Sequence, residues 1–413
     1  MRTATLALAP LLALLSCPPA CGEPGDTWTQ WRGPQRDGQF EGQPWPDSIA
    51  EQRLKQQWRI ELGPSYSGPI VSDSLVFTTA SEQSTWEQVT AYDRTTGEKK
   101  WETRWKGAIS VPFFARSNGS WIRATPAYDG ERLYVAGMRD LLVCLDAATG
   151  KELWKVDFVE KFATPLPSFG FVCSPLLDGE FVYVQAGGGF CKLNKRTGEV
   201  VWRTLEDGGG MYGSAFSSPA IATLNDTRQA LVQTRQVLAG VDLETGEVLW
   251  SEKIPATRGM NILTPTVHEE KLFTSSHGGK TWLFELAQDD AKTVVEPMWE
   301  SKLQGYMSSP VVIAGHAYLH MKNQRFACID LQTGKEKWIT TPYGKYWSMV
   351  AQGDKILALD ERGELLLIRA TPEKFDLLES RKISQSPTWA HLALCNGQLF
   401  VREQNALVAY EWK

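Results

Sequence analysis

The chain has 413 residues, a formal net charge of −5 and a sequence isoelectric point near 5.7. This acidic balance excludes the basic surface on which nucleic-acid binding depends. Aromatic residues make up 11% of the chain and 17 residues are Trp, which favours a fold that repeats one aromatic packing contact many times.

The N-terminus is predicted to be an export signal. The basic start Met1-Arg2 precedes an apolar stretch, Ala4–Leu15, that is too short to span a bilayer as a helix. Ala20-Cys21-Gly22 fits the small-x-small rule, so residues 1–22 would be cleaved as a signal peptide. Alternatively, the Leu-Leu-Ser before Cys17 resembles a bacterial lipobox, and Cys17 would then carry a lipid anchor. Both forms imply a periplasmic or cell-envelope protein.

Five later segments repeat one pattern, in which an apolar run ends in Asp or Asn (Tyr-Asp in the first), a Thr-Gly pair follows, and a short run closes on Trp. The segments are Tyr92–Trp101, Leu145–Trp154, Leu193–Trp202, Val241–Trp250 and Ile329–Trp338. Each predicts a strand, a turn with Gly at its left-handed position, and a second strand. Repetition at this spacing fixes the architecture before any chemistry is considered.

A second hairpin precedes most copies and begins at a Ser/Thr-Pro pair, as in the segments that start at Ala124, Cys173 and Ser217. Together the two hairpins give four strands per unit, which is the composition of a propeller blade. The repeating unit is therefore predicted to be one blade.

The closing tryptophans give the number of blades: Trp58, Trp101, Trp154, Trp202, Trp250, Trp299 and Trp338. One further unit ends near Leu377 without a Trp, and Trp389–Tyr410 offers only three strands. Leu54–Leu62 is an outer strand without a blade. Joining these two ends predicts an all-β, eight-bladed β-propeller closed by N- and C-terminal strands. Residues 54–413 would form this single propeller, preceded by an N-terminal leader at residues 23–53.

The repeat resembles the PQQ-like β-propeller repeat family, of the quinoprotein alcohol dehydrogenase-like superfamily, whose blades end in AxDxxTGxxxW. The resemblance covers residues 28–413 and implies one of two functions. Quinoprotein dehydrogenases hold pyrroloquinoline quinone on the propeller axis, whereas BamB-like members are scaffolds in outer-membrane protein assembly. The leader segment Trp28–Gly38 looks like that of many secreted members and carries no known chemistry.

The segments that lead into the inner strands are expected to surround one mouth of the axial channel. Seven candidate ligand-binding residues lie in them: Tyr66, Arg123, Tyr212, Asn261, Tyr306, Trp347 and Trp389. Arg116, Arg258 and Lys345 belong to the same segments. Aromatic rings with a few cations suit a planar, anionic or sugar-like ligand. The alternative is that these side chains only pack one blade against the next.

Residues 103–121 depart furthest from the repeat and carry Phe113 and Phe114. A long irregular loop of this kind is either a lid or contact surface, or an insertion that packs its Phe pair on a neighbouring blade. The sequence leaves both interpretations open.

The sequence favours a binding or assembly scaffold, BamB-like in architecture, over an enzyme. No adjacent Cys pair or CxxCH motif of the quinoprotein dehydrogenases is present, and no catalytic residue can be assigned. We expect no metal site, because the cysteines have no CxxC spacing, and we expect Cys144 and Cys328 to be small buried side chains. No cofactor is expected; the alternative is pyrroloquinoline quinone with calcium in a dehydrogenase.

Expected partners are therefore a protein or a small ligand such as a carbohydrate, and not a nucleic acid. Contact with a membrane is expected only through a lipid anchor at Cys17.

Overall fold

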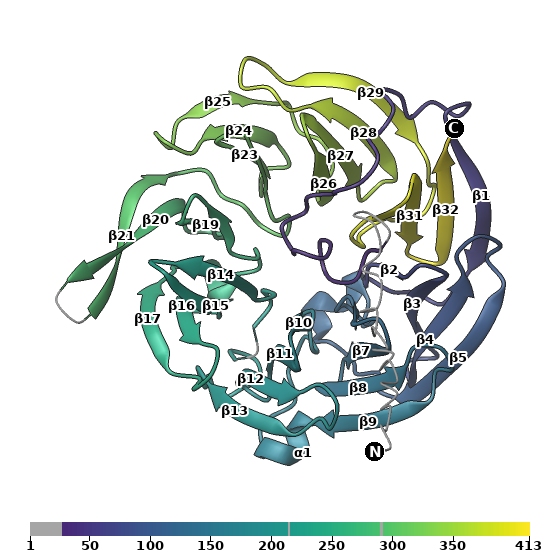
Figure 1. Cartoon of the computed structure of the whole chain (residues 1–413), viewed down its shortest axis with the longest axis horizontal. Helices are drawn as coiled ribbons and strands as arrows, with labels where there is room; N and C mark the ends of the chain where they lie inside the picture. Colours follow the sequence, from purple (N-terminus) through teal and green to yellow (C-terminus); the bar gives the residue numbers. More distant parts are fainter. Residues whose placement is uncertain (1–26, 214, 290–291) are drawn as a thin grey trace, which may run out of the picture.

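Eight four-stranded antiparallel sheets form a closed ring in the computed structural model, which describes residues 27–213, 215–289 and 292–413 (Figure 1). The predicted eight-bladed β-propeller is thereby confirmed. The predicted signal peptide lies outside the described residues.

The first four blades follow one another along the chain, and each runs from an inner to an outer strand. They consist of β2 (Ile70–Val71), β3 (Leu75–Glu82), β4 (Trp86–Asp93) and β5 (Lys99–Lys106); β6 (Ala127–Tyr128), β7 (Arg132–Gly137), β8 (Leu141–Asp146) and β9 (Glu152–Asp157); β10 (Leu176–Asp178), β11 (Phe181–Ala186), β12 (Gly189–Asn194) and β13 (Val200–Thr204); and β14 (Ala220–Leu224), β15 (Thr227–Gln233), β16 (Val237–Asp242) and β17 (Val248–Lys253).

The next three blades continue the pattern, and the eighth takes its outer strand from the other end of the chain. They consist of β18 (Thr266–His268), β19 (Lys271–Ser275), β20 (Thr281–Asp289) and β21 (Lys292–Ser301); β22 (Val311–Ile313), β23 (His316–His320), β24 (Phe326–Asp330) and β25 (Glu336–Ile339); β26 (Trp347–Gln352), β27 (Lys355–Asp360), β28 (Glu364–Arg369) and β29 (Asp376–Lys382); and β30 (Ala393–Cys395), β31 (Gln398–Glu403), β32 (Ala406–Trp412) and β1 (Leu54–Glu61).

The ring is closed by β1, which pairs antiparallel with β32. The register runs from Leu54 opposite Trp412 to Glu61 opposite Ala406. This is the predicted union of the orphan N-terminal strand with the incomplete last blade. It covers an edge of β32 that would otherwise be free to pair with another chain.

Helical structure in residues 27–213, 215–289 and 292–413 is limited to three short turns: η1 (Phe113–Asn118), α1 (Phe158–Phe162) and η2 (Thr257–Gly259). None of the helices in the described part of the chain has the length and apolar character needed to cross a membrane.

The closing tryptophans lock each blade to the next. A Cβ atom placed on the Gly of the following Thr-Gly turn would lie only 2.4 to 2.9 Å from the indole ring, so that no other residue fits there. The five pairs are Trp58–Gly97, Trp101–Gly150, Trp154–Gly198, Trp202–Gly246 and Trp299–Gly334. The Gly thus serves two needs, the left-handed turn and the flat surface for the ring.

Trp250 and Trp338 are the exceptions, because the blades that follow them have no Thr-Gly turn. Trp338 Nε1 donates to the Thr371 carbonyl of the next blade at 2.8 Å. Trp250 Nε1 donates to Gln229 Oε1 of its own blade at 2.6 Å, and this side chain is 5% exposed. A surface groove of about 440 Å³ remains between β17 and the long β20–β21 hairpin. Trp250 is therefore a packing residue, as predicted for the repeated Trp, but it packs against a different partner.

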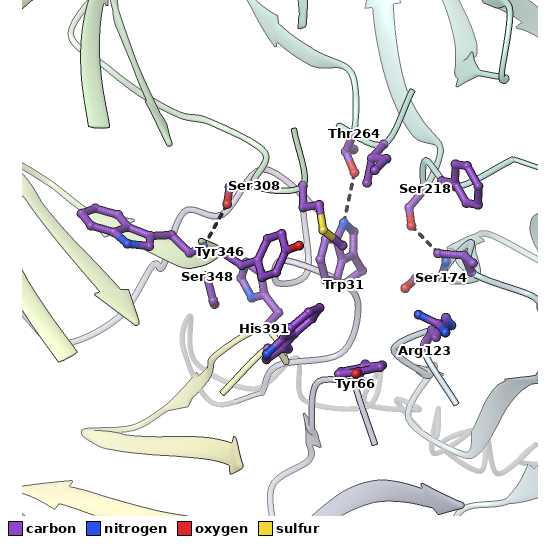
Figure 2. Close-up of a pocket in the computed structure, with 16 residues that line it drawn as sticks. Trp31, Tyr66, Arg123, Ser174, Ser218, Thr264, Ser308, Tyr346, Ser348 and His391 are labelled. Carbon is purple, nitrogen blue, oxygen red and sulfur yellow. Dashed lines mark hydrogen bonds between the residues drawn. The ribbon is translucent and has the colours of Figure 1, made fainter. Parts of the chain in front are cut away.

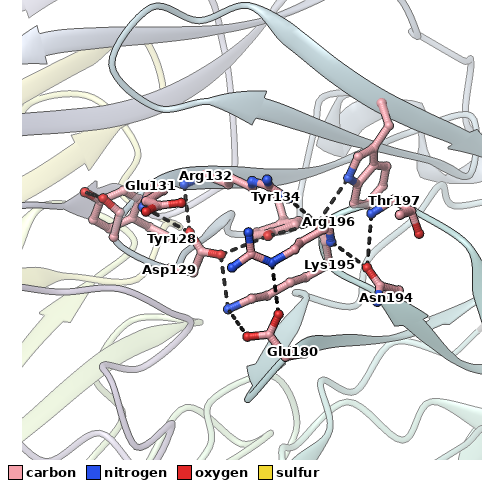
Figure 3. A network of polar contacts seen from close by, with 12 residues as sticks. Tyr128, Asp129, Glu131, Arg132, Tyr134, Glu180, Asn194, Lys195, Arg196 and Thr197 are labelled. Atoms are coloured by element: carbon pink, nitrogen blue, oxygen red, sulfur yellow. Dashed lines mark hydrogen bonds and ion pairs between the residues drawn. The ribbon is translucent and has the colours of Figure 1, made fainter.

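The turn that receives Trp154 is also held by polar contacts between blades (Figure 3). Trp154 Nε1 donates to the carbonyl of Lys195 at 3.1 Å, and the Tyr134 hydroxyl donates to the same carbonyl at 3.2 Å. The Lys195 ammonium lies 3.5 Å from the Asp129 carboxylate and 3.8 Å from that of Glu180. One short turn thus joins the second and third blades.

Replacing Trp154 with Ala should lower the free energy of unfolding by about 2–4 kcal/mol, because the indole fills the space above Gly198 while part of it stays exposed. Trp154→Phe should lose only about 1 kcal/mol, the contribution of the hydrogen bond to Lys195. Chemical denaturation measures both values. Leu153→Ala is the control, since Leu153 is 43% exposed; equal losses in Leu153→Ala and Trp154→Ala would contradict this role.

The hydrophobic core lies between blades rather than in one centre. In one cluster, Tyr134 and Cys144 of the second blade pack with Val182 and Cys191 of the third. Cys328 is buried in an equivalent cluster between the sixth and seventh blades. Cys144 and Cys328 are thus small buried side chains, as predicted.

The leader crosses the axis of the ring, where Figure 1 shows it as the purple segment. Its hydrogen bonds reach seven blades in turn, through Val71, Tyr128, Leu177, Pro219, Thr264, Pro310 and Ala351. It then continues into β1, the outer strand of the eighth blade. Residues 28–40 therefore cross the channel, and residues 45–49 pack against the seventh and eighth blades through Gln352, Glu379 and Trp412.

Two buried arginines hold the leader in the channel. Arg36 donates to the carbonyls of Pro219 at 2.9 Å, Pro175 at 2.7 Å and Ser174 at 3.1 Å. Arg32 donates to the carbonyls of Asp37 and Pro310. Burial lowers the pKa of each guanidinium to about 10, so both remain charged at neutral pH.

Candidate functional site

One mouth of the channel is a cavity to which every blade contributes one side chain. Each of these residues lies two positions before the Ser/Thr-Pro pair, or its equivalent, that starts the inner strand. They are Tyr66, Arg123, Val172, Phe216, Ile262, Met307, Tyr346 and Trp389. Because alternate residues of an extended segment face the same way, this common position turns all eight side chains toward the axis.

The Ser/Thr residues of these markers join the blades below the cavity. The Ser174 hydroxyl accepts a hydrogen bond from the Thr125 backbone N–H, and the Ser218 hydroxyl accepts one from the Ser174 N–H, both at 2.9 Å. Figure 2 shows the second of these bonds beside the cavity. The Ser/Thr-Pro pattern therefore has a structural cause, since the hydroxyls of Thr125, Ser174, Ser218 and Ser309 each accept from a backbone N–H of the preceding blade.

Arg123 is the one Arg or Lys among the described residues that line the cavity, and burial lowers the pKa of His391, which also lines it, to about 3. Arg123 Nη2 donates to the Gly119 carbonyl at 3.1 Å, and the guanidinium carbon lies 5.3 Å from the centre of the Tyr66 ring. The Nε has no hydrogen-bond partner within the described residues. Burial lowers the pKa of this guanidinium and raises that of Tyr66 to about 12. The cavity thus offers the positive charge of Arg123 and one N–H group that has no partner among the described residues.

An aromatic wall begins at Tyr66, beside Arg123. The Trp389 ring lies 5.0 Å from Tyr66 and 4.3 Å from Tyr346, measured between ring centres. Trp31 of the leader closes the cavity from below, where its Nε1 donates to the Thr264 hydroxyl at 3.0 Å (Figure 2). These rings could hold a flat group by stacking.

Four of the seven residues predicted from the sequence line this cavity: Tyr66, Arg123, Trp347 and Trp389. Trp347 does so only in part, because its ring stacks on His320 at 4.9 Å inside the blade. The remaining three, Tyr212, Asn261 and Tyr306, do not line it.

Each of these three residues has a different environment. Tyr212 is 78% exposed and borders a separate depression with Arg235 and Arg258. Asn261 is fully buried, and its amide nitrogen donates to the carbonyls of Arg235 and Ile254. Tyr306 packs against His277 and Tyr346.

Asn261 and Tyr306 miss the cavity because each lies one position away from the residue that faces the axis. Asn261 and Tyr306 lie three residues before Thr264 and Ser309, and a shift of one residue turns a side chain to the opposite face of an extended segment. Sequence reasoning therefore missed Phe216 and Ile262 at the position that faces the axis. It also missed Trp31, for which the sequence carries no signal.

Pyrroloquinoline quinone with calcium does not fit this cavity. The volume of the cavity is about 140 Å³, whereas pockets that enclose a drug-sized ligand measure roughly 300–1,000 Å³. The lining contains no Asp or Glu, although calcium prefers carboxylate ligands. Within the described ranges, no group of three or more His, Cys, Asp and Glu side chains could hold a metal ion. A cavity of this size suits one benzene-sized group.

Two buried carboxylates join blades beside the mouth. Glu87 Oε1 accepts the Met138 N–H at 2.8 Å and Oε2 accepts Trp105 Nε1 at 3.0 Å. Asp140 accepts the Gly187 N–H at 2.8 Å. Burial raises the pKa of both carboxyls to about 7.

Because the folded state binds the Glu87 proton more tightly than the unfolded chain, Glu87 should make the free energy of unfolding fall as pH rises from about 4.5 to about 7. Its contribution should change by an amount on the order of 3 kcal/mol. Denaturation of the wild type and of Glu87→Gln at pH 5 and pH 8 isolates this change, since the other titrating groups are common to both. A stability difference independent of pH would refute the assignment.

Comparison with known proteins reveals relatives in sequence and in fold. Residues 85–340 match the family model described as outer membrane protein assembly factor BamB. BamB of Yersinia pestis is 25% identical over 264 residues, which cover 59% of this chain and 64% of BamB. The matched region thus spans less than two thirds of that relative.

Solved structures share the fold over almost the whole ring. BamB from Moraxella catarrhalis aligns with a TM-score of 0.60 at 16% identity, covering 87% of this chain and 98% of that one. Quinohemoprotein alcohol dehydrogenase from Comamonas testosteroni aligns with a TM-score of 0.66 at 15% identity, covering 94% and 80%. At these identities the structural likeness establishes the propeller alone, whereas the sequence match covers more than half of the chain. The chain therefore belongs to the PQQ-like propeller family of the outer membrane protein assembly factor BamB.

Proposed function

We propose that this protein is an exported, non-catalytic scaffold that supports the assembly of outer-membrane proteins by binding protein partners. The observation that carries the proposal is the match of residues 85–340 to BamB. The axial cavity supports it, because a small cavity without carboxylates suits binding better than quinone-dependent catalysis.

Deleting the gene in the organism that encodes it should lower the amount of folded outer-membrane β-barrel proteins. Heat-modifiable mobility on gels measures the folded fraction. Expression of the wild-type protein should restore it, whereas a form that lacks residues 1–22 and stays in the cytoplasm should not. Unchanged barrel levels after deletion would refute the proposed function.

Export is tested separately by mass spectrometry of the protein isolated from cells. Cleavage by a signal peptidase would leave a chain that begins at Glu23, and lipid attachment would leave one that begins at a modified Cys17. Either result supports export. A chain that retains Met1 would contradict it.

A second candidate function is the binding of a small ligand at the axial cavity, for which the buried Arg123 and its free Nε speak. Benzoate, a flat anion of suitable size, should quench the fluorescence of Trp389. Trp389→Ala should weaken benzoate binding by about 1–3 kcal/mol. Glucose is the neutral comparison. Absence of quenching by both compounds would dismiss this candidate.

A further inference from the structure

A row of four phenylalanines leads from solvent to the axial cavity. Phe113 and Phe114, on η1, are 80% and 54% exposed. Ring centres are 5.6 Å apart from Phe113 to Phe114, 6.3 Å from Phe114 to Phe169, and 5.6 Å from Phe169 to Phe216, which lines the cavity. We call these four residues the aromatic row.

The loop that carries Phe113 and Phe114 is held by hydrogen bonds, so the exposure of these two rings is a property of the fold. Val111 is buried, and its N–H donates to the Ser120 hydroxyl at 3.1 Å. The Tyr66 hydroxyl donates to the carbonyl of Asn118 at the end of η1. No residue of η1 is buried, so Phe113 and Phe114 contribute little to the core. Contiguous exposed apolar side chains of this kind mark interaction sites.

Cationic side chains flank the aromatic row. Arg116 lies on η1 beside the exposed pair, and the guanidinium of Arg235 stacks on Phe216 at 4.6 Å. Arg123 and Arg235 donate their hydrogen bonds to backbone carbonyls: Arg123 to that of Gly119, and Arg235 to those of Gly213 and Arg258. The surface therefore favours a partner that carries carboxylates.

The spacing of the rings indicates the shape of the partner. Alternate side chains of an extended strand recur about every 6.6 Å along one face. The separations in the aromatic row, from 5.6 to 6.3 Å, are close to this repeat. Successive apolar side chains of an extended segment could thus contact successive rings.

We propose that the aromatic row docks an extended segment of a partner protein that carries apolar side chains at every second position and acidic residues at its two ends. This proposal rests on the scaffold function above and names the chemistry of its partner. The apolar side chains contact the four rings, and the carboxylates at the ends of the segment pair with Arg116 on η1 and with Arg123 at the mouth.

The test uses two fluorescein-labelled twelve-residue peptides that alternate Val and Ser in their central part, one with Glu at both ends and the other with Lys at both ends. Fluorescence anisotropy with the purified full-length protein should show binding of the acidic peptide only, and higher salt should weaken it. The double variant Phe113→Ser, Phe114→Ser should bind at least tenfold more weakly, and Arg116→Glu at least threefold. Equal binding of the basic peptide, or unchanged binding by the double variant, overturns the proposal.

Matched controls keep the test independent of folding. Leu153→Ser with Val201→Ser removes two apolar side chains that are 43% and 50% exposed on outer strands, and it should bind the acidic peptide as the wild type does. Light scattering tests whether the protein binds a second copy of itself, and sedimentation with phosphatidylglycerol vesicles tests whether it binds lipid. If the Phe pair drives self-association or vesicle binding instead of peptide binding, the proposal is wrong.

Failure of this proposal is distinguishable from failure of the proposed function. A deletion strain with normal barrel proteins refutes the scaffold function, while Phe-dependent peptide binding in vitro would still support the surface. Conversely, a barrel defect that the double Phe variant repairs completely would refute the aromatic row as the partner site and leave the scaffold function intact.

Discussion

A chain that begins at residue 63 should fail to form the ring. It lacks β1, so β32 loses the partner to which it is bonded from Trp412 to Ala406, and it lacks the leader that fills the channel. We expect a loss of more than about 5 kcal/mol, comparable to the whole stability of many domains. The exposed edge of β32 should then promote aggregation, visible by size-exclusion chromatography.

Two longer chains serve as controls. A chain that begins at Thr27 retains every residue described here and should melt as the full-length protein does. A chain that begins at Glu51 keeps β1 but lacks the leader, and should fold with a reduced melting temperature. If the chain from residue 63 melts at the wild-type temperature, β1 does not close the ring.

Arg36→Ala should be the most damaging single substitution in the leader. The guanidinium donates to three carbonyls, those of Ser174, Pro175 and Pro219, which would be left in a buried site without this donor. We expect a loss of about 3–5 kcal/mol, measured by chemical denaturation. Arg36→Lys should recover little, because one ammonium cannot reproduce the planar fork.

Arg53→Ala provides the comparison, since Arg53 is exposed and donates to the Lys413 carbonyl at 3.5 Å. Its loss should stay within about 0.5 kcal/mol. Similar melting of Arg36→Ala and Arg53→Ala would show that the buried guanidinium does not hold the leader.

The architecture could be predicted because the repeated residues mark where each strand and each turn of a blade lies. Trp101 and Gly150, for example, each occupy a fixed place in the pattern, and their contact in the structure explains why both recur. The closure of the ring followed from the unpaired strand Leu54–Leu62. These features depend on local spacing, which a single sequence displays.

The candidate site was less accessible to prediction, for two physical reasons. A shift of one position along the chain decides whether a side chain faces the axis. Tyr306 was therefore selected from the sequence, although Met307 is the residue that lines the cavity. The leader depends on distant backbone atoms: the partners of Arg36 are carbonyls 138 to 183 residues away, and a carbonyl has no sequence signature. The aromatic row joins Phe114 to Phe169 across two blades, which no local pattern reveals.

The path of the leader also governs when the protein can fold. The first described residues bond to blades that are synthesised later, and β1 finds its partner only when Trp412 has been made. Contacts between such distant residues make folding slow, because long loops must close before the contacts can form. The early blades are made of consecutive strands, but the leader and β1 must wait for the later blades and for the last strand. Once assembled, the ring has its first and last strands paired in one sheet, so the release of either strand must break the hydrogen bonds between them.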